Sequence, residues 1–533
     1  MIVSIFNDVI GPVMRGPSSS HCAAALRIGR LARDLMDGRF SDVLVEFDRQ
    51  GSLPTTHDSQ GSDMGLCGGL LGWEAVDDRL PGSLAALEAS GVTIRMVTVD
   101  AGDPHPNTYR LTLTDGGGES HHLRAISTGG GMIEVIAIDG FTVSIFGDYA
   151  ETLLWVTPGA DARAASAALA FGTEADDVLV HEHDGVFLVE VKSQEPVRDD
   201  DLAELRQQGL VTAVRRLAPV LPVRSRKTAS VPFTTCSEML RADAGRGTPL
   251  WQLAVEYESA RSGLGERQLL DQMIEIVRIL RKSVAQGIAG TSYDDRVLGH
   301  QSGRFAENMR SGRLLGGGAL NRIVLYVTAL MEVKSAMGVI VAAPTAGACA
   351  ALPGAVIAMA EEMGLGEEEM AQALLASGLI GVFIATRFTF AAEVGGCQVE
   401  GGSAASMAAA ALSTLAGGTL AQSVAAASMA LQSMIGLICD PVANRVEVPC
   451  LGKNVMAASN ALSAANMALS DFDPVIPLDE VIDTVKRVAE QMPRELRCTN
   501  LGGLSITPTA IALEATLARK REAACGRAAC VCG

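Results

Sequence analysis

The sequence is poor in aromatic side chains and in positive charge. Aromatic residues make up 4% of its 533 residues, and the formal net charge is −18. Nucleic acids and anionic membranes both require basic protein surface, and single-stranded nucleic acids also require aromatic stacking platforms. We therefore expect no nucleic acid and no membrane as partner.

Long runs of Leu, Ile and Phe are also lacking. Two segments, 335–360 and 401–439, are free of charge over lengths that could span a membrane, but they are rich in Ala and Gly, and the first contains Pro344 and Pro353. This composition is typical of tightly packed core helices. The first residues, MIVSIFNDVIGP, lack a basic region followed by a long apolar stretch, so we expect no signal peptide.

The remaining composition describes a globular protein. Hydrophobic residues make up 48% and charged residues 20%, which excludes a disordered chain, and the length predicts two to four domains. The eleven cysteines are odd in number and scattered, as expected in a reducing cytoplasm rather than in a disulfide framework. We expect a cytoplasmic protein.

The hydrophobic pattern divides the chain. Residues 1–130 alternate like strands around one helical stretch, which predicts an α+β domain. Residues 131–215 follow a strand–turn–helix–strand order, with the helix at 161–171, that is typical of an ACT-like, ferredoxin-like domain. Such domains bind amino acids or mediate dimers, so we expect a homodimer, although a purely structural role is an equal alternative.

The second half of the chain is helical in pattern. A polar linker is expected at 216–248, and an all-α domain with an Ala- and Gly-rich centre at 249–520. Small residues allow helices to approach closely, which leaves room for a buried site. The tail at 521–533 contains Cys525, Cys530 and Cys532.

Three cysteines stand out in the helical half because turn-forming residues flank them. Cys397 follows two glycines, Cys439 precedes Asp-Pro, and Cys450 follows Val-Pro. Thiolates are soft ligands for iron or zinc, and Gly or Pro backbone can wrap closely around a cofactor. The spacing matches no compact zinc finger, so burial as small apolar side chains is the alternative explanation.

Two further motifs are candidates for ligand binding. GPSSSH, residues 16–21, precedes a helix, where hydroxyl groups and backbone amides can hold a carboxylate; simple capping by the serines is the alternative. APTAGACAALPG, residues 343–354, places a small-residue turn inside an apolar run, where the amides need partners such as an anion; a helix break is the alternative.

Together these motifs resemble the iron–sulfur-dependent L-serine dehydratases. The resemblance rests on the sequence motifs GPSSSH, the three glycines at 129–131 that precede the ACT-like segment, APTAGACAALPG, GGCQ–E–GSA, CDPV–VEVPC, KN–MAASNA and LGGL–TPT. They occur over nearly the whole chain, with the β part of that family fused ahead of its α part. The resemblance implies a [4Fe–4S] cluster held by Cys397, Cys439 and Cys450.

The resemblance also implies a reaction and a set of site residues. One iron without a protein thiolate would act as a Lewis acid on the β-hydroxyl of a small amino acid, L-serine, and a base would remove the α-proton. The aminoacrylate so formed hydrolyses to pyruvate and ammonia. The implied substrate-binding residues are Ser18, Ser19, Ser20, Thr345, Gly347 and Asn454. His21 is the implied proton-transfer residue, and Cys532 is a candidate tail ligand for the open iron.

The sequence departs from the family pattern at three points. Gln60 stands where the family has a histidine before Thr-Asp, Cys498 stands where a glutamate is usual, and Cys22 replaces a common threonine. Glutamine cannot take up a proton at neutral pH, so His57 is a second candidate for the catalytic base.

These departures leave alternatives open. The substrate could be another β-substituted amino acid, namely threonine, a different 3-hydroxy amino acid, or cysteine. The chain could also be a non-catalytic paralogue that keeps the cluster as a structural or redox element, or zinc could replace iron at the thiolates.

Overall fold

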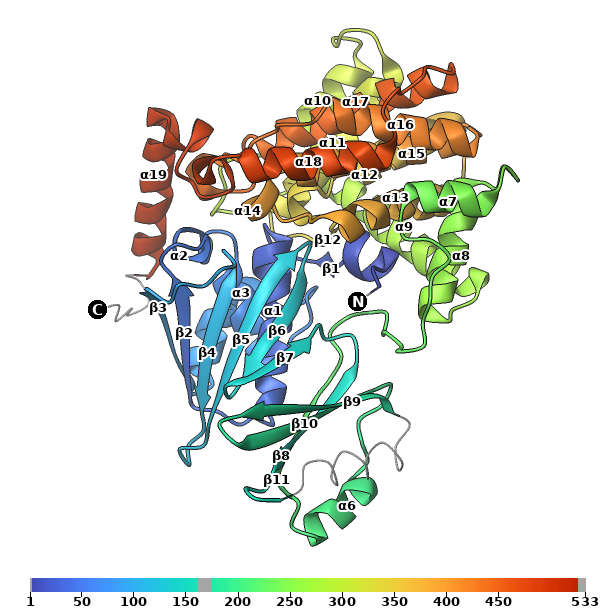
Figure 1. Cartoon of the computed structure of the whole chain (residues 1–533). Coiled ribbons are helices and arrows are strands. Elements are labelled where there is room, and N and C mark those ends of the chain that lie inside the picture. Colours follow the sequence, from blue (N-terminus) through green and yellow to red (C-terminus); the bar gives the residue numbers. More distant parts are fainter. Residues whose placement is uncertain (1, 161–174, 526–533) are drawn as a thin grey trace.

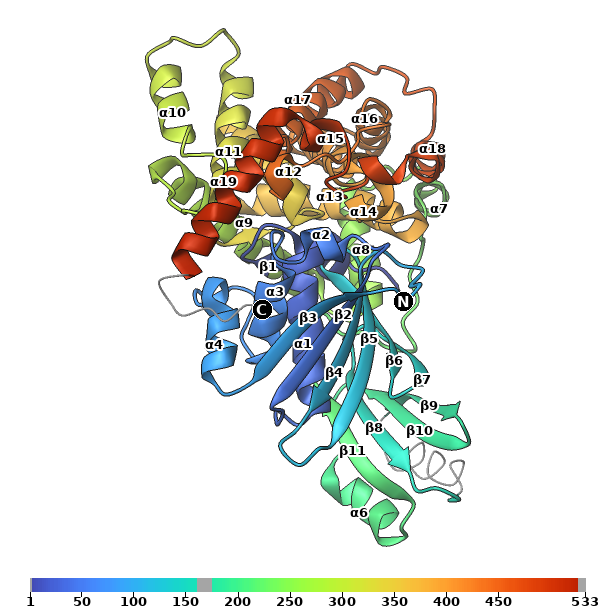
Figure 2. The ribbon, with the colours of Figure 1, turned by 90° about the vertical axis from the view of Figure 1, so that its left-hand side faces the viewer.

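The computed structural model describes residues 2–160 and 175–525. A helical domain lies at one end of a six-stranded sheet, and a smaller four-stranded sheet lies at the other end (Figures 1 and 2). The expected division into an N-terminal part rich in strands and a helical C-terminal part is confirmed.

The six-stranded sheet has the order β3-β2-β4-β5-β6-β7, and only the β2–β3 pair is parallel. Its strands are β2 (Asp42–Asp48), β3 (Thr93–Val99), β4 (Thr108–Thr114), β5 (Ser120–Gly129), β6 (Met132–Ile138) and β7 (Phe141–Ile145). The sheet therefore extends past the domain boundary expected at residue 130, because β6 pairs with β5 and β7 with β6. The glycines at 129–131 form the turn of a hairpin within this sheet.

Four helices accompany this sheet: α1 (Ala24–Leu35), α2 (Leu53–Thr56), α3 (Ser62–Leu70) and α4 (Ser83–Ala89). Helices α1 and α3 pack unusually closely. A Cβ at Gly65 would lie 2.0 Å from the carbonyl oxygen of Cys22, and one at Gly69 would lie 2.1 Å from that of Leu26. Because α3 has glycines at these two positions, its backbone can lie directly against the start of α1. This contact positions the GPSSSH motif, which precedes α1.

The smaller sheet has the order β11-β8-β10-β9 and is antiparallel throughout. Its elements are β8 (Ala150–Val156), β9 (Ala175–His183), β10 (Val186–Ser193), α6 (Asp199–Gln207) and β11 (Val211–Leu217). The helix expected at 161–171 lies outside the described residues.

The helical domain is built around an alanine-rich helix, α15, which contacts α12, α13, α16 and α17. The helices are α7 (Cys236–Asp243), α8 (Leu250–Ser262), α9 (Glu266–Ala289), α10 (Ser302–Arg310), α11 (Gly318–Ser335), α12 (Ala351–Met363), α13 (Glu367–Arg387), α14 (Ala392–Gly395), α15 (Ser403–Leu415), α16 (Leu420–Gln432), α17 (Cys450–Leu469), α18 (Leu478–Gln491) and α19 (Pro508–Cys525).

The first charge-free segment and the start of the second lie in the interior of this domain, as expected, whereas much of 414–438 reaches the surface. Residues 403–413 of α15 are all buried. Among the described residues, two helical stretches are long and apolar enough to cross a membrane by length and composition, Ala346–Met363 and Glu367–Arg387, but they are 72% and 78% buried inside the protein. Their burial identifies them as core helices.

The first residues of the chain belong to the helical domain, which the sequence pattern did not predict. The helical turn η1 (Ile5–Val9) packs on α13, where Gly378 and Gly381 leave room for Ile5 and Val9. Strand β1 (Val13–Met14) pairs with β12 (Ile340–Val341). The chain therefore starts in one domain and immediately continues into the other.

Candidate metal and substrate site

The three cysteines predicted as metal ligands are all buried beside the junction of the two domains. Cys397 follows Gly396, whose φ of 72° and close neighbours, Met492 Sδ and Leu437 O, leave no space for a side chain. Cys439 lies in an extended segment that pairs with Arg497, and Cys450 is the first residue of α17. The glycine turn and the helix start thus place thiols from three separate segments in one region.

Cys397 and Cys439 form the centre of a possible metal-binding group. Their sulfur atoms and a carboxylate oxygen of Glu400 lie within 4.8 Å of one another. The Cys439 thiol has its pKa raised by the neighbouring thiols of Cys397 and Cys498 and then by burial, and burial followed by Cys397 raises that of Cys450. Such a set of thiols becomes fully ionised only beside a cation.

The donor set fits a thiolate-bound metal centre. Buried, closely spaced cysteines are the ligands of iron–sulfur clusters and of zinc. Lys453, on α17, places its Nζ 3.8 Å from the Cys397 sulfur and 2.7 Å from Asp440 Oδ1. This partly buried ammonium group offsets the negative charge that several thiolates would bring together.

The GPSSSH motif forms the turn before α1 and lies against the helical domain. The ring of His21 is fully buried: its Nδ1 lies 3.0 Å from Ser18 Oγ, and its Nε2 lies 2.8 Å from Thr56 Oγ1. Burial and the nearby His57 lower the pKa of His21 to about 3, although Asp63 acts in the opposite direction. The imidazole is therefore neutral at physiological pH.

Glu393, on α14, joins this motif to the helical domain. Its Oε1 accepts a hydrogen bond from Ser20 Oγ at 3.3 Å and lies 3.5 Å from His21 Nδ1. Its Oε2 and the neighbouring Asn107 Nδ2 are buried and lack hydrogen-bond partners within the described residues. Burial raises the pKa of Glu393, while Ser20 and Asn107 favour its charged form. The Asn107 amide thus lies close enough to influence the Glu393 carboxylate, without a hydrogen bond of standard geometry between Nδ2 and Oε2.

The APTAGACAALPG motif lies on the other side of the same region. Thr345 Oγ1 donates to Glu400 Oε1 at 2.7 Å, and Ser19 Oγ accepts from the amide of Ala346 at 3.2 Å. A Cβ at Gly347 would lie 2.9 Å from Glu400 Oε1. The glycine therefore allows Glu400 to approach this loop.

Asn454 fastens the loop to α17. Its Oδ1 accepts from the amides of Ala350 and Ala351, and its Nδ2 donates to the carbonyls of Gly347 and Cys450. These four bonds use the full capacity of the side-chain amide. Asn454 consequently positions Gly347 and Cys450 relative to each other.

His57 and Gln60 point in different directions. His57 Nδ1 lies 2.7 Å from Asp63 Oδ1, and its side chain lines a surface cavity beside α19. Burial lowers the pKa of His57, but the contact with Asp63 outweighs it and the net pKa is raised. Gln60, which is buried, instead donates to the Cys498 sulfur at 3.6 Å. The residue that faces the cysteines is therefore the glutamine.

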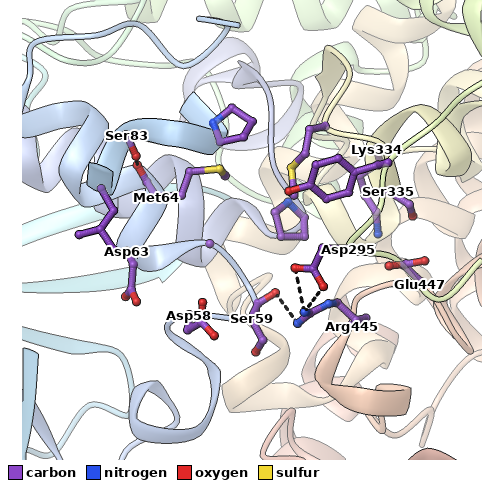
Figure 3. Close-up of a pocket in the computed structure, with 16 residues that line it drawn as sticks. Asp58, Ser59, Asp63, Met64, Ser83, Asp295, Lys334, Ser335, Arg445 and Glu447 are labelled. Carbon is purple, nitrogen blue, oxygen red and sulfur yellow. Dashed lines mark hydrogen bonds and ion pairs between the residues drawn. The ribbon is translucent and has the colours of Figure 1, made fainter. Parts of the chain in front are cut away.

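A cavity of about 240 Å³ lies between the two domains, next to the segment that joins Cys439 to Cys450 (Figure 3). Arg445 projects from this segment and binds Asp295 at 2.8 Å and the carbonyl of Ser59 at 3.2 Å. Lys334 and Glu447 line the same cavity. Both domains thus contribute polar groups to its wall.

The structure brings together most of the residues that the sequence singled out: Ser18, Ser19, Ser20, His21, Thr345, Gly347, Cys397, Cys439, Cys450 and Asn454. His57 lies beside a separate cavity, and Cys532 falls outside the described residues. The sequence analysis gave no role to Glu393, Glu400, Asn107 or Lys453, although Glu400 lies in the motif GGCQ–E–GSA and Lys453 in KN–MAASNA. For Glu400 a signal existed, because it follows Cys397 by three residues; Asn107 carries no such local signal.

Comparison with known proteins gives a consistent set of relatives. Residues 245–505 match the family model described as "Serine dehydratase alpha chain". A "Probable L-serine dehydratase, alpha chain" of Bacillus subtilis (strain 168) is 40% identical over 282 residues, which are 53% of this chain and 94% of the relative.

The chain also matches a beta chain and a single-chain relative. A "Probable L-serine dehydratase, beta chain" of Bacillus subtilis (strain 168) is 41% identical over 151 residues, 28% of this chain and 67% of the relative. An "L-serine dehydratase" of Streptomyces coelicolor (strain ATCC BAA-471 / A3(2) / M145) is 34% identical over 279 residues, 52% of this chain and 61% of the relative.

Proposed function

This chain belongs to the L-serine dehydratase family, with β and α parts joined in one polypeptide, and we propose that it converts L-serine to pyruvate and ammonia. The observation that carries the proposal is the meeting of the two parts at the cysteines. Ser20 of the β part binds Glu393, and Ser19 binds the amide of Ala346, both in the α part.

We further propose that Cys397, Cys439 and Cys450 hold a [4Fe–4S] cluster. Their burial, the close approach of the Cys397 and Cys439 sulfur atoms, the electrostatic interaction of Cys450 with Cys397, and the ammonium group of Lys453 support this assignment. When bound, such a cluster supplies a Lewis acid that assists the loss of the β-hydroxyl group.

The protein's own residues bind and orient the substrate in this proposal. The unpaired Oε2 of Glu393 is a suitable acceptor for the α-ammonium group, and the unpaired Nδ2 of Asn107 a suitable donor to a substrate oxygen. His21 is the proposed proton-transfer residue, held in place by Ser18 and Thr56. The closed surroundings exclude water until the aminoacrylate is released.

Several properties follow as further proposals. The four-stranded sheet with α6 serves as an ACT-like regulatory or dimer-forming domain, and the active protein is a cytoplasmic homodimer. Its strand order and antiparallel pairing support the ACT-like assignment.

A second candidate function is the same elimination on another β-substituted amino acid. The contact between Gln60 and Cys498 favours it, because two departures from the family pattern meet beside the cysteines. Threonine and cysteine are the first alternatives to examine.

Anaerobically reconstituted protein, assayed against a panel of amino acids for 2-oxo acid, ammonia and sulfide, tests both candidates. We expect turnover of L-serine that is lost in air and partly restored by ferrous iron and thiol. Robust turnover of another substrate without turnover of serine would refute the first candidate. Absence of iron after reconstitution would refute the cluster assignment. Zinc in the isolated protein would instead support a zinc site at the same thiolates.

A further inference from the structure

A fourth buried thiol lies in the cysteine site. Cys498 is 4% exposed and packs with Cys397 and Cys439 in a small cluster, which is separate from the main hydrophobic core. The other members of this cluster are Ala392 and Leu437. Cys498 is thus a neighbour of two of the residues proposed to hold the metal centre.

The backbone holds Cys498 against Cys439 from both sides. The amide of Cys439 donates to the carbonyl of Leu496 at 2.9 Å, and the amide of Cys498 donates to the carbonyl of Cys439 at 3.2 Å. These two bonds form a short parallel bridge centred on Arg497. The position of the Cys498 thiol is therefore fixed by the fold and not by a flexible loop.

The backbone of Cys498 also adopts an unfavourable conformation. Its φ is 58°, in the left-handed region that cysteine rarely occupies. Such strain persists where the surrounding structure requires it, and it is concentrated at functional sites. Here the strained residue directs a thiol toward Cys439.

Gln60 is oriented to stabilise a sulfur anion at this position. Its Nε2 donates to Asn444 Oδ1 at 3.2 Å and to Cys498 Sγ at 3.6 Å, while Oε1 lies 3.9 Å from the same sulfur. Asn444 is itself fixed, because its Nδ2 donates to the carbonyl of Thr55. Gln60 thus offers an acceptor to the protonated thiol through Oε1 and a donor to a thiolate through Nε2, and such hydrogen bonds tune thiolate ligands.

From this arrangement we propose that Cys498 is the fourth thiolate ligand of the metal centre in the substrate-free protein. This inference rests on the proposed cluster. With the cluster bound, Cys498 would give up its thiol proton and hold the iron that Cys397, Cys439 and Cys450 leave open; a substrate oxygen would displace the thiolate, which would then take a proton back. Cys498 would thereby protect the iron that must be accessible during the reaction.

The test uses the iron that a three-thiolate cluster loses on oxidation. Ferricyanide removes one electron from a [4Fe–4S]²⁺ cluster, and an iron without a thiolate then leaves as Fe²⁺, which converts the cluster to paramagnetic [3Fe–4S]⁺. Full-length protein, reconstituted anaerobically, is treated with ferricyanide; EPR spectra and iron content are measured.

We expect the native protein to keep its iron, and Cys498→Ala to lose about one iron in four and to show the three-iron EPR signal. Cys67→Ser, a buried cysteine of the sheet domain, is the matched control and should behave like the native protein. Equal iron loss from native protein and Cys498→Ala would overturn the proposal. So would protection that depends on the tail cysteines, as measured with the Cys530→Ser/Cys532→Ser variant.

Two further variants keep the test decisive. If Cys498→Ala fails to fold, Gln60→Leu retains the thiol but removes its donor; we expect a lower reduction potential of the cluster, and an unchanged potential would count against the proposal. If Cys397→Ala leaves the cluster spectrum unchanged, the cluster assignment itself fails, which is distinguishable from failure of the fourth ligand.

Discussion

Ser20 and Glu393 lie 373 positions apart in the chain, yet their side chains are joined by a hydrogen bond of 3.3 Å. The bond links the loop before α1 to the short helix before Cys397. It shows why neither half of the chain contains the whole site.

Glu393→Gln should lower kcat/KM for the proposed substrate about 100-fold, because the buried carboxylate orients His21 and offers Oε2 to the substrate. Steady-state kinetics of the reconstituted enzyme measure this loss. Glu490→Gln, an exposed change on α18, is the control and should be neutral. Comparable activity of the two variants would exclude Glu393 from the site.

Gly347→Ala should reduce activity while changing stability little. The new methyl group would lie 2.9 Å from Glu400 Oε1, so the carboxylate must move away from the loop. Gly452→Ala is the matched control, because its Cβ would meet nothing within 4 Å on helix α17. Circular dichroism and kinetics together decide the case: a large fall in melting temperature for Gly347→Ala would point to a structural role instead.

Asn454→Ala should lower the free energy of unfolding by about 3 kcal/mol, since two buried amides and two carbonyls lose their partner. Asn460 lies on the same helix as Asn454 but makes a single bond, to the carbonyl of Ala430 on α16, so Asn460→Ala should cost about 1 kcal/mol. Chemical denaturation of both variants gives the comparison. Equal losses would show that the four-bond arrangement contributes no extra stability.

His21 predicts a specific dependence of stability on pH. Its pKa is lowered to about 3 in the folded protein, from an ordinary value of 6.5. The unfolded chain therefore takes up a proton between these values while the folded protein does not. Stability from this group is complete above pH 6.5 and is lost as the pH falls.

Between about pH 7.5 and 5.5 the native protein should lose about 1.4 kcal/mol more stability than His21→Gln, which has no such group. Denaturant titrations of both proteins at the two pH values measure this difference. Identical pH dependence would mean that His21 can be protonated in the folded state.

Lys453→Met should weaken metal binding about 10- to 100-fold, because the ammonium group lies 3.8 Å from the Cys397 sulfur and also holds Asp440. Iron retained after competition with a chelator is the readout. Lys486→Met, on the exposed face of α18, is the control. Unchanged iron retention in Lys453→Met would show that this charge does not support the thiolates.

The sequence predicted the helical half well, because apolar residues repeat there at helical spacing and the charge-free segments could only be interior. The sheet continues past the domain boundary expected at residue 130. The local sequence pattern does not distinguish a hairpin turn within one sheet from the start of the next domain. Whether β6 pairs with β5 depends on contacts that the local pattern does not contain.

The site residues were predictable where they lie next to one another in a short sequence motif, such as GPSSSH. It was not predictable where single residues converge from distant segments. Asn107 is ordinary in its local sequence. Gln60 and Cys498 stand out only as departures from the family pattern, and only the fold places Asn107 next to Glu393 and Gln60 next to Cys498.

The position of Ile5–Val9 affects how the β part and the α part come together. In the Bacillus subtilis relatives the two parts are named as separate chains, and here the start of the β part is embedded in the α part against α13. Joining the parts in one polypeptide turns an encounter between two molecules into an intramolecular event, with an effective concentration on the order of millimolar. Complete sites should therefore form even where the protein is scarce, a condition under which two separate chains would remain apart.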